Sequence, residues 1–170
     1  PGFGGINLED ISAPRCFEIE ERLKEMLDIP VFHDDQHGTA IVVLAGIING
    51  LRVTGKKKED CRVVVNGAGS AGVAITKLLL TYGFKHVTMC DREGIIGKDY
   101  PNLNWMQKKM TEVTNLENAS GTLADALRGA DIFVGVSAPN IVTPEMVSSM
   151  NKDAILFAMA NPVPEIMPDV

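Results

Sequence analysis

The sequence predicts a protein of the α/β class, with a doubly wound parallel sheet preceded by a β-α-β segment that carries acidic residues. Short runs of apolar, often β-branched residues alternate with segments of helix length, which is the order of parallel strands joined by crossover helices. A glycine-rich turn separates one of these runs from the helix that follows it. Two further runs, near the start of the chain, each end in a pair of adjacent acidic residues.

Each element has its own signal. Strands are expected over residues 5–10, 29–35, 62–65, 86–90, 131–136 and 154–159, where apolar runs are bounded by turn-forming or charged residues. Helices are expected over residues 14–27, 38–51, 70–82, 122–128 and 144–150, with a further helix within residues 102–117 of the irregular stretch 94–120. Pro14 suits the first position of a helix, and Gly83 and Gly129 suit the position just after one.

The segment from Gly38 to Leu51 is apolar almost all the way round. Such a helix is expected to be buried on most sides. We therefore place it at the seam between two domains or two subunits, with Gly46 and Gly50 allowing close approach of a neighbour. Asn49 and Arg52 interrupt the apolar stretch well before it reaches the length of a membrane span, so no membrane partner is expected.

Length, charge and cysteine content limit the class of protein. The chain has 170 residues and a net charge of −6, a balance that argues against binding to nucleic acid. Its three cysteines lack C-x-x-C spacing and suit the reduced thiols of a cytoplasmic protein. The chain begins with Pro-Gly and ends without a terminating helix. We therefore expect a piece of a longer protein, in which residues 1–36 end one domain and residues 37–170 form an incomplete dinucleotide-binding domain.

The glycine-rich turn has the pattern G-x-G-x-x-G, directly after a strand and at the start of a helix. Gly67 would allow the tight turn, Gly69 would let the backbone approach a pyrophosphate, and Gly72 would permit close packing of helix on strand. Free N–H groups and the helix dipole also favour a bound phosphate there. The candidate cofactor-binding residues of this turn are Gly67, Ala68, Gly69, Ser70, Ala71 and Gly72. This context predicts a Rossmann-type NAD(P)-binding domain; the alternative is a glycine-rich turn without a ligand.

Asp91 ends the next strand, where the partner of the adenosine ribose is expected. A carboxylate at this position accepts hydrogen bonds from the ribose 2′-hydroxyl and repels a 2′-phosphate, which favours NAD. Arg92 could instead pair with that phosphate, so NADP stays open as the cofactor.

Two acid pairs, Glu9-Asp10 and Asp34-Asp35, end strands that one helix separates. A right-handed crossover brings the ends of two such parallel strands to the same edge of a sheet. Four carboxylates meeting there would repel one another without a cation, and oxygen ligands suit Mg²⁺ or Mn²⁺. The sequence therefore predicts a divalent metal site.

A zinc pair is the alternative, because His33 and His37 flank the second acid pair at i, i+4 spacing. Gly38 and the strand-like Val31-Phe32 argue against a helix through these residues. Both histidines are therefore expected to orient the carboxylates or to cap the next helix.

Several motifs occur together in this order: INLED at 6–10, VFHDDQHGTA at 31–40, GAGSAG at 67–72 and FAMANP at 157–162. Over essentially the whole chain they closely resemble the malic enzymes, in particular the shorter bacterial form. The resemblance implies that Glu9, Asp10 and Asp35 are the protein ligands of Mg²⁺ or Mn²⁺, and that Asp34 supports the catalytic lysine. It also implies that Asn161 faces both the nicotinamide and the substrate carboxylate.

The resemblance further implies oxidative decarboxylation of L-malate to pyruvate and CO₂ with reduction of NAD(P)⁺, by a homodimer or a higher homo-oligomer. In that family the general base Lys and the general acid Tyr lie upstream of this chain, whose only tyrosines are Tyr82 and Tyr100. Residues 1–170 alone are therefore expected to be inactive. Two alternatives are a malolactic-type enzyme that retains NAD and releases lactate, and a non-catalytic dinucleotide-sensing domain, in which the converging acids would have no purpose.

Overall fold

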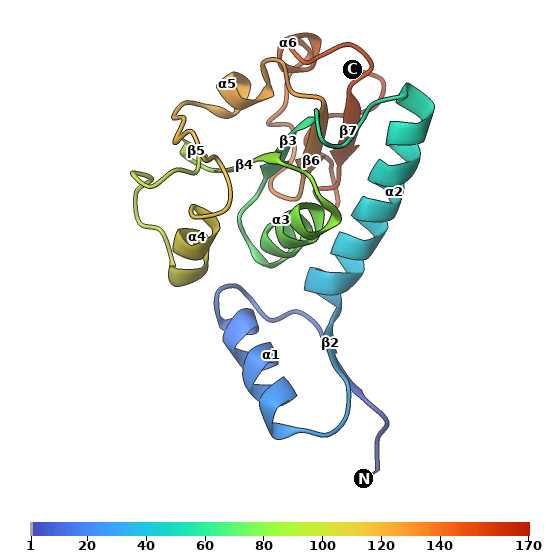
Figure 1. Ribbon diagram of the computed structural model, residues 1–170, viewed down its shortest axis with the longest axis vertical. Coiled ribbons are helices and arrows are strands. Elements are labelled where there is room, and N and C mark those ends of the chain that lie inside the picture. Colours follow the sequence, from blue (N-terminus) through green and yellow to red (C-terminus); the bar gives the residue numbers. More distant parts are fainter. Residues whose placement is uncertain (1) are drawn as a thin grey trace.

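The computed structural model describes residues 2–170 and shows a central sheet covered by helices, with a small β-α-β unit at the N-terminal end (Figure 1). The helices and strands follow the expected order. Their bounds are β1 (Ile6–Leu8), α1 (Arg15–Met26), β2 (Val31–His33), η1 (Asp34–Gly38), α2 (Thr39–Thr54), β3 (Arg62–Asn66), α3 (Ser70–Tyr82), β4 (His86–Asp91), β5 (Gly94–Ile95), α4 (Trp105–Met110), α5 (Leu123–Leu127), β6 (Ile132–Gly135), α6 (Pro144–Ser148) and β7 (Ile155–Ala158).

The central sheet has the strand order β5-β4-β3-β6-β7. The strands β4, β3, β6 and β7 are parallel, and the two-residue β5 pairs antiparallel with β4 at the edge. The chain leaves β3 for β4 on one side and reaches β6 on the other, so the carboxyl ends of β3 and β6 form the edge where ligands of such sheets bind, here called the cofactor crevice. The α/β class and the doubly wound sheet are confirmed, with β5 as an unexpected antiparallel strand.

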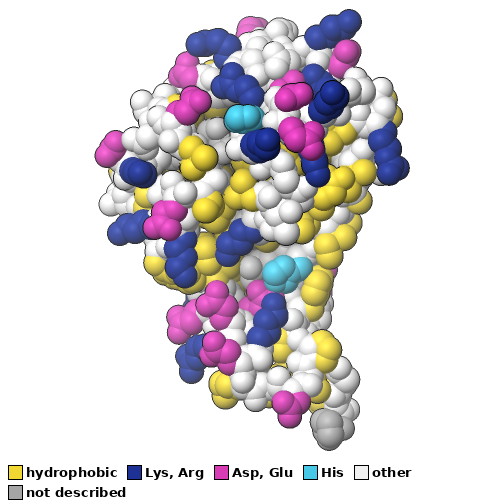
Figure 2. Space-filling model, viewed as in Figure 1, with side chains coloured by type: hydrophobic (Ala, Val, Ile, Leu, Met, Phe, Trp, Pro, Cys, Tyr) yellow, Lys and Arg dark blue, Asp and Glu magenta, His cyan; other side chains and the backbone are white. Residues whose placement is uncertain are grey.

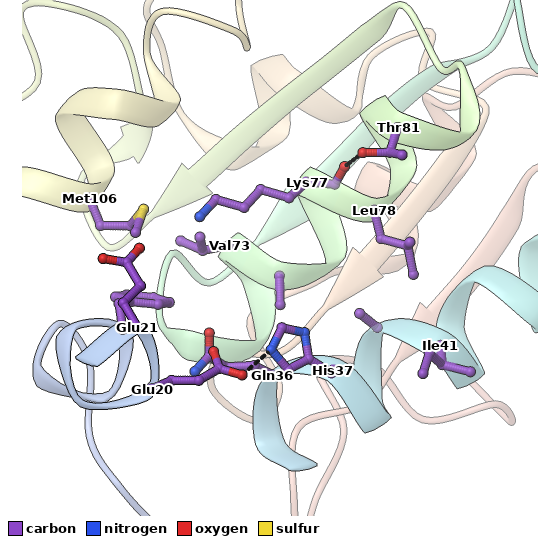
Figure 3. Close-up of a pocket in the computed structure, with 13 residues that line it drawn as sticks. Glu20, Glu21, Gln36, His37, Ile41, Val73, Lys77, Leu78, Thr81 and Met106 are labelled. Atoms are coloured by element: carbon purple, nitrogen blue, oxygen red, sulfur yellow. Dashed lines mark hydrogen bonds and ion pairs between the residues drawn. The ribbon is translucent and has the colours of Figure 1, made fainter. Parts of the chain in front are cut away.

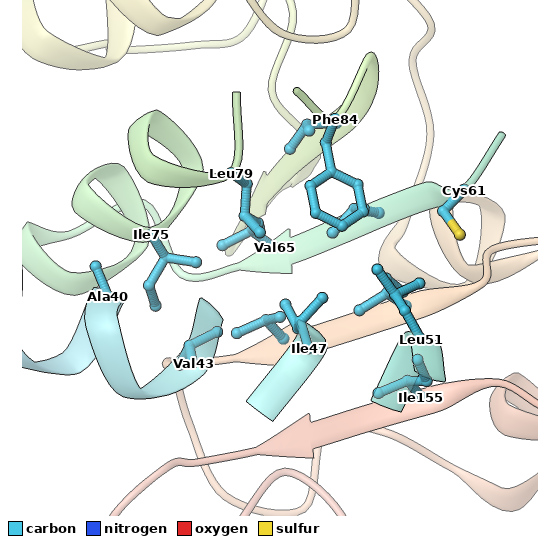
Figure 4. Packing of buried hydrophobic residues seen from close by; sticks show 14 of the residues in the cluster. Ala40, Val43, Ile47, Leu51, Cys61, Val65, Ile75, Leu79, Phe84 and Ile155 are labelled. Atoms are coloured by element: carbon cyan, nitrogen blue, oxygen red, sulfur yellow. The ribbon is translucent and has the colours of Figure 1, made fainter. Parts of the chain in front are cut away.

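Two apolar layers cover the two faces of the sheet. On one face, α2 and α3 pack on β3, β6 and β7 (Figure 4). On the other face, α5 and α6 pack on a second cluster around Phe133. The β3 residues Val63, Val64 and Val65 are all at most 2 % exposed, as expected for a central strand covered on both sides.

The N-terminal unit is a parallel pair, β1 and β2, joined by α1. In this pair Leu8 lies opposite His33, so the two strands end side by side, as the acid-pair argument requires. The helix α1 packs on the larger unit through Phe17, whose ring meets the Trp105 ring edge to face at 6.1 Å. The α1 end of this unit is therefore fixed against α4 and α3.

A helix does run through the second acid pair, contrary to expectation. Asp34–Gly38 forms the π-helical turn η1, which continues into α2 as one helix from Asp34 to Thr54. The Asp34 carboxylate lies over Gly38, where a Cβ atom would overlap it, so the glycine read as a helix breaker instead gives the turn room. The 21-residue helix is long and apolar enough to cross a membrane by length and composition alone, a test that core helices of soluble proteins also pass.

The helix α2 is buried on one side only. Its inner residues Ala40, Val43, Ile47 and Leu51 pack on the sheet. On its outer side Ile41, Val42 and Val53 are 55 %, 61 % and 87 % exposed, and hydrophobic side chains gather along this edge of the molecule (Figure 2). The expectation of burial on most sides is therefore wrong within residues 2–170, because these residues supply a neighbour for one face only. The placement at a domain or subunit seam stays a prediction.

Candidate functional site

The turn after β3 is shaped by contacts at its first and last glycines. Gly67 has φ 110°, a left-handed backbone that favours glycine, and its N–H donates to Cys90 O (2.9 Å). A Cβ atom on Gly72 would overlap the carbonyl oxygen of Gly67. A Cβ atom on Gly69, in contrast, would meet no protein atom within 4 Å. The middle glycine therefore faces open space at the start of α3, where a ligand phosphate would meet the backbone.

The loop after β6 closes the other side of the crevice. A Cβ atom on Gly67 would overlap Val136 O, so the turn packs directly on this loop. At the end of β3, Asn66 Nδ2 donates to Ser137 Oγ (2.7 Å). The two loops at the carboxyl ends of β3 and β6 are thus joined by side chains as well as by the sheet.

Asp91 lies at the end of β4 and is linked to the phosphate turn through Gln107. The Gln107 Nε2 atom is 3.3 Å from Asp91 Oδ2 and 3.4 Å from Ala68 O. The other Asp91 oxygen, Oδ1, accepts the N–H of Arg92 (2.9 Å). The structure therefore brings Asp91 to the same edge of the sheet as Ala68, as the ribose argument requires.

Asn161 follows β7 at the same edge of the sheet and is exposed. The residue before it, Ala160, donates its N–H to Oε2 of Glu165 (3.0 Å). Glu165 is fully buried. Asn161 is therefore held by a loop that a buried carboxylate anchors.

The acid pairs come together only in part. The N–H of Asp10 donates to Asp35 Oδ2 (2.8 Å), so the two strand ends do meet. Glu9 instead accepts a hydrogen bond from Asn7 (2.7 Å), and Asp34 lies over Gly38. In the described part of the chain, no three His, Cys, Asp or Glu side chains are grouped closely enough to hold a metal ion. The four carboxylates therefore do not converge as expected in this arrangement, in which Glu9 and Asp35 accept hydrogen bonds from N–H groups instead.

The donor set nevertheless suits a hard divalent cation. Carboxylates at the ends of two paired strands are the oxygen ligands that Mg²⁺ and Mn²⁺ take, and Asp10 and Asp35 are already adjacent. The Glu9 carboxylate would have to leave Asn7 to join them. The metal ligands and the supporting role of Asp34 stay predictions.

The two histidines do not form a zinc pair on a helix, because His33 still belongs to β2. His33 is fully buried, its ring nitrogens have no hydrogen-bond partner among residues 2–170, and its Nδ1 lies 3.9 Å from Asp35 Oδ2. His37 Nε2 donates to Glu20 Oε1 (2.6 Å), which also accepts from Lys24 (2.7 Å). Burial alone would raise the pKa of the Glu20 carboxyl, but hydrogen bonds from Lys24 and His37 hold the pKa below its usual value.

A hollow of about 350 Å³ lies beside this histidine, between α1, the η1–α2 junction and α3 (Figure 3). Lys77 reaches into it from α3, and burial lowers the pKa of its ammonium group. The hollow shares Gln36 and His37 with the turn that carries the second acid pair, but residues 67–69 of the phosphate turn do not line it. It is therefore separate from the cofactor crevice.

Comparison with known proteins identifies the family. The family model described as "Malic enzyme, NAD binding domain" matches residues 36–167. The chain belongs to the malic enzyme family. It is 57% identical to the NAD-dependent malic enzyme of Geobacillus stearothermophilus and 55% identical to the bifunctional malic/malolactic enzyme of Bacillus subtilis, over 100% and 99% of this chain. The crystal structure of an NAD-dependent malic enzyme from Thermotoga maritima superposes with a TM-score of 0.96 at 53% identity.

The malic enzymes it resembles are longer. The chain spans 36% and 42% of the Geobacillus and Bacillus proteins and 45% of the Thermotoga chain, while 99% of this chain is covered by the last. Other relatives of similar identity are named for NADP, such as the NADP-dependent malic enzyme of Haemophilus influenzae at 51%. The family and the NAD(P)-binding fold inferred from the motifs are thus confirmed. The choice between NAD and NADP, the metal and the domain boundary at residue 36 are not.

Two residues at the crevice gave no signal in the sequence. Gln107 lies in the irregular stretch 94–120, where only the Asn104 cap of α4 marks a helix start. Glu165 lies in a proline-rich segment, where a lone glutamate is usually exposed. Its burial depends on Gly135 at the end of β6, where a Cβ atom would overlap the Glu165 carboxyl group.

Proposed function

We propose that the protein to which this chain belongs catalyses oxidative decarboxylation of L-malate to pyruvate and CO₂, with reduction of NAD(P)⁺. The observation that carries the proposal is the family match across residues 36–167, over the same residues that form the open phosphate turn. A nicotinamide cofactor would accept the hydride in this chemistry. The malic enzyme names of the relatives, both NAD- and NADP-dependent, support the same reaction class.

The residues of this chain would bind and orient rather than transfer protons. Backbone N–H groups around Gly69 would hold the pyrophosphate. Asp91 would accept a hydrogen bond from the ribose 2′-hydroxyl, which favours NAD over NADP. Asn161 would face both the nicotinamide and the substrate carboxylate at the nicotinamide end of the crevice. The base and the acid that the family resemblance implies would lie outside residues 1–170, so these residues alone are expected to bind a dinucleotide without turning over malate.

We further propose that Glu9, Asp10 and Asp35 hold Mg²⁺ or Mn²⁺, with Asp34 beside them. Such a cation would supply Lewis acidity for a hydroxyl or carbonyl oxygen of the substrate. The proposal is supported by the hydrogen bond from Asp10 to Asp35, which joins the two strand ends, and by the oxygen chemistry of the donors. We also propose a cytoplasmic homodimer or higher homo-oligomer, with the outer face of α2 at a domain or subunit seam.

A malolactic outcome is a second candidate, because the Bacillus subtilis relative is named as a bifunctional malic/malolactic enzyme. The two outcomes differ in product and in net reduction of the cofactor. The full-length protein should therefore be incubated with L-malate, Mn²⁺ and either NAD⁺ or NADP⁺, and NAD(P)H, pyruvate and lactate measured together. We expect pyruvate and NADH in equal amounts. Lactate without net NADH would favour the malolactic reaction, and absence of both products would contradict the proposal.

A further inference from the structure

Glu165 is a fully buried carboxylate that has no cationic side chain as a partner among residues 2–170. It is 0 % exposed, and none of the ion pairs formed within residues 2–170 includes it. A buried carboxylate is stable only when hydrogen-bond donors replace the water it loses. The donors that Glu165 uses therefore show what the residue holds in place.

The donors come from the loops after β6 and β7. The Oε1 atom accepts the N–H (2.9 Å) and the hydroxyl (3.0 Å) of Ser137, which follows β6. The Oε2 atom accepts the N–H of Ala160 (3.0 Å), which follows β7 and precedes Asn161. One carboxyl group thus joins two loops at the ligand-binding edge of the sheet.

The contact continues to the phosphate turn. Asn66, the residue before Gly67, donates to the same Ser137 hydroxyl that donates to Glu165. The Ser137 hydroxyl accepts from Asn66 and donates to Glu165, so this short chain of hydrogen bonds runs from Asn66 through Ser137 to Glu165. Both ends of the crevice, the phosphate turn and the loop that carries Asn161, are therefore connected to Glu165.

We propose that Glu165 is a positioning residue for the cofactor crevice. Through Ala160 it sets the place of Asn161 at the nicotinamide end, and through Ser137 and Asn66 it supports the phosphate turn. The Asn161 part of this inference rests on the proposed function, whereas the network of hydrogen bonds does not.

The variant Glu165→Gln separates the two connections. In either orientation of the new amide, its NH₂ group faces a backbone N–H, that of Ala160 or that of Ser137. The orientation that keeps both Ser137 contacts preserves more hydrogen bonds, so the loss should fall on Ala160. Ser137→Ala makes the opposite change, because it keeps the Ala160 contact and removes the link to Asn66.

The test uses the full-length protein, with Glu117→Gln as the matched control because Glu117 is exposed. For Glu165→Gln we expect the Ala160 amide to exchange with deuterium about tenfold faster or more. We also expect kcat/KM for malate to fall about tenfold or more, with Kd for NAD⁺ within about threefold of wild type. Glu117→Gln should leave all three quantities unchanged.

Three results would overturn the proposal. The first is that, in Glu165→Gln, the exchange rate of the Ala160 amide and kcat/KM for malate both equal those of Glu117→Gln. The second is faster exchange throughout β3 and β6 together with a parallel loss of NAD⁺ affinity, which would make Glu165 a general stabiliser. The third concerns Ser137→Ala, which replaces Glu165→Gln in the test if that variant does not fold. We expect Ser137→Ala to weaken NAD⁺ binding about tenfold, and an unchanged Kd for NAD⁺ would refute the link. A wild-type protein without malate turnover would contradict the proposed function alone, because the exchange measurement would still test the network.

Discussion

The backbone of Gly72 packs directly on the carbonyl oxygen of Gly67, so that a Cβ atom at residue 72 would overlap that oxygen. This contact holds the first turn of α3 against the end of β3. A Cβ atom on Gly69 meets no protein atom within 4 Å. Two glycines of one motif thus have different roles: Gly72 is required by the protein itself, whereas Gly69 leaves room for a ligand.

Gly72→Ala should lower the free energy of unfolding by about 1–3 kcal/mol, because the methyl group forces α3 away from the turn. Gly69→Ala is the matched control and should change the same free energy by less than about 1 kcal/mol, since no neighbour is displaced. Denaturant titration of the full-length variants measures both values. Equal stability losses in the two variants would show that the packing argument is wrong.

Asp91→Ser should relax or invert a preference for NAD over NADP. The carboxylate is placed beside the phosphate turn through Gln107, and its removal leaves Arg92 free to pair with a 2′-phosphate. The ratio of kcat/KM for NAD⁺ to that for NADP⁺ is the measurement, in wild type and variant. A wild-type protein that strongly prefers NADP⁺ would rule out this role for Asp91.

Asp35→Asn should abolish Mn²⁺-dependent turnover and leave NAD⁺ affinity nearly intact. The amide can still accept the N–H of Asp10, so the local fold is kept while the charge at the proposed cation site is lost. Asp28→Asn, an exposed position before β2, serves as the control. Normal activity of Asp35→Asn at saturating malate and Mn²⁺ would remove Asp35 from the metal site.

Asp131→Asn should destabilise the protein at neutral pH by about 1–2 kcal/mol. Burial alone would raise the pKa of Asp131, but hydrogen bonds from the Arg62 N–H, Lys56 and Asn151 outweigh it and hold the pKa below its usual value. A lowered folded-state pKa stabilises the fold above the unfolded value of about 4, and this contribution is lost as the pH falls through the folded-state pKa.

The pH dependence follows from that sign. The difference in unfolding free energy between wild type and Asp131→Asn should be largest at pH 7 and should shrink in acid, below pH about 4. Thermal or denaturant unfolding between pH 3 and pH 7 measures the difference. A gap that is constant across this range would mean that the ionised carboxylate contributes nothing.

Most of the fold could be predicted from local patterns. The continuous apolar runs of β3 and β6 and the glycine turn before α3 indicate buried parallel strands and crossover helices without any knowledge of tertiary contacts. Gly46 and Gly50 of α2 do allow close approach, but to Phe157 and Ile155 of β7 rather than to another domain or subunit.

What could not be predicted depends on contacts between distant residues. The outer face of α2 is also largely apolar, although it carries Asn49 and Arg52, so apolar character alone does not tell which face the sheet covers. The carboxylates of Glu9 and Asp35 can rotate toward nearby N–H groups. The positions of the ends of β1 and β2 therefore do not determine where these charges lie. The buried state of Glu165 depends on Gly135, thirty residues earlier in the chain.

Calorimetric titration of NAD⁺ into the full-length protein and its Gly69→Val variant tests the central claim most directly. A branched side chain at residue 69 would occupy the open space where the backbone is proposed to meet the pyrophosphate. We predict saturable binding to wild type and a Kd at least about a hundredfold weaker in the variant, with thermal unfolding showing that both are folded. The same Kd for NAD⁺ in both proteins would mean that the dinucleotide does not bind at this turn.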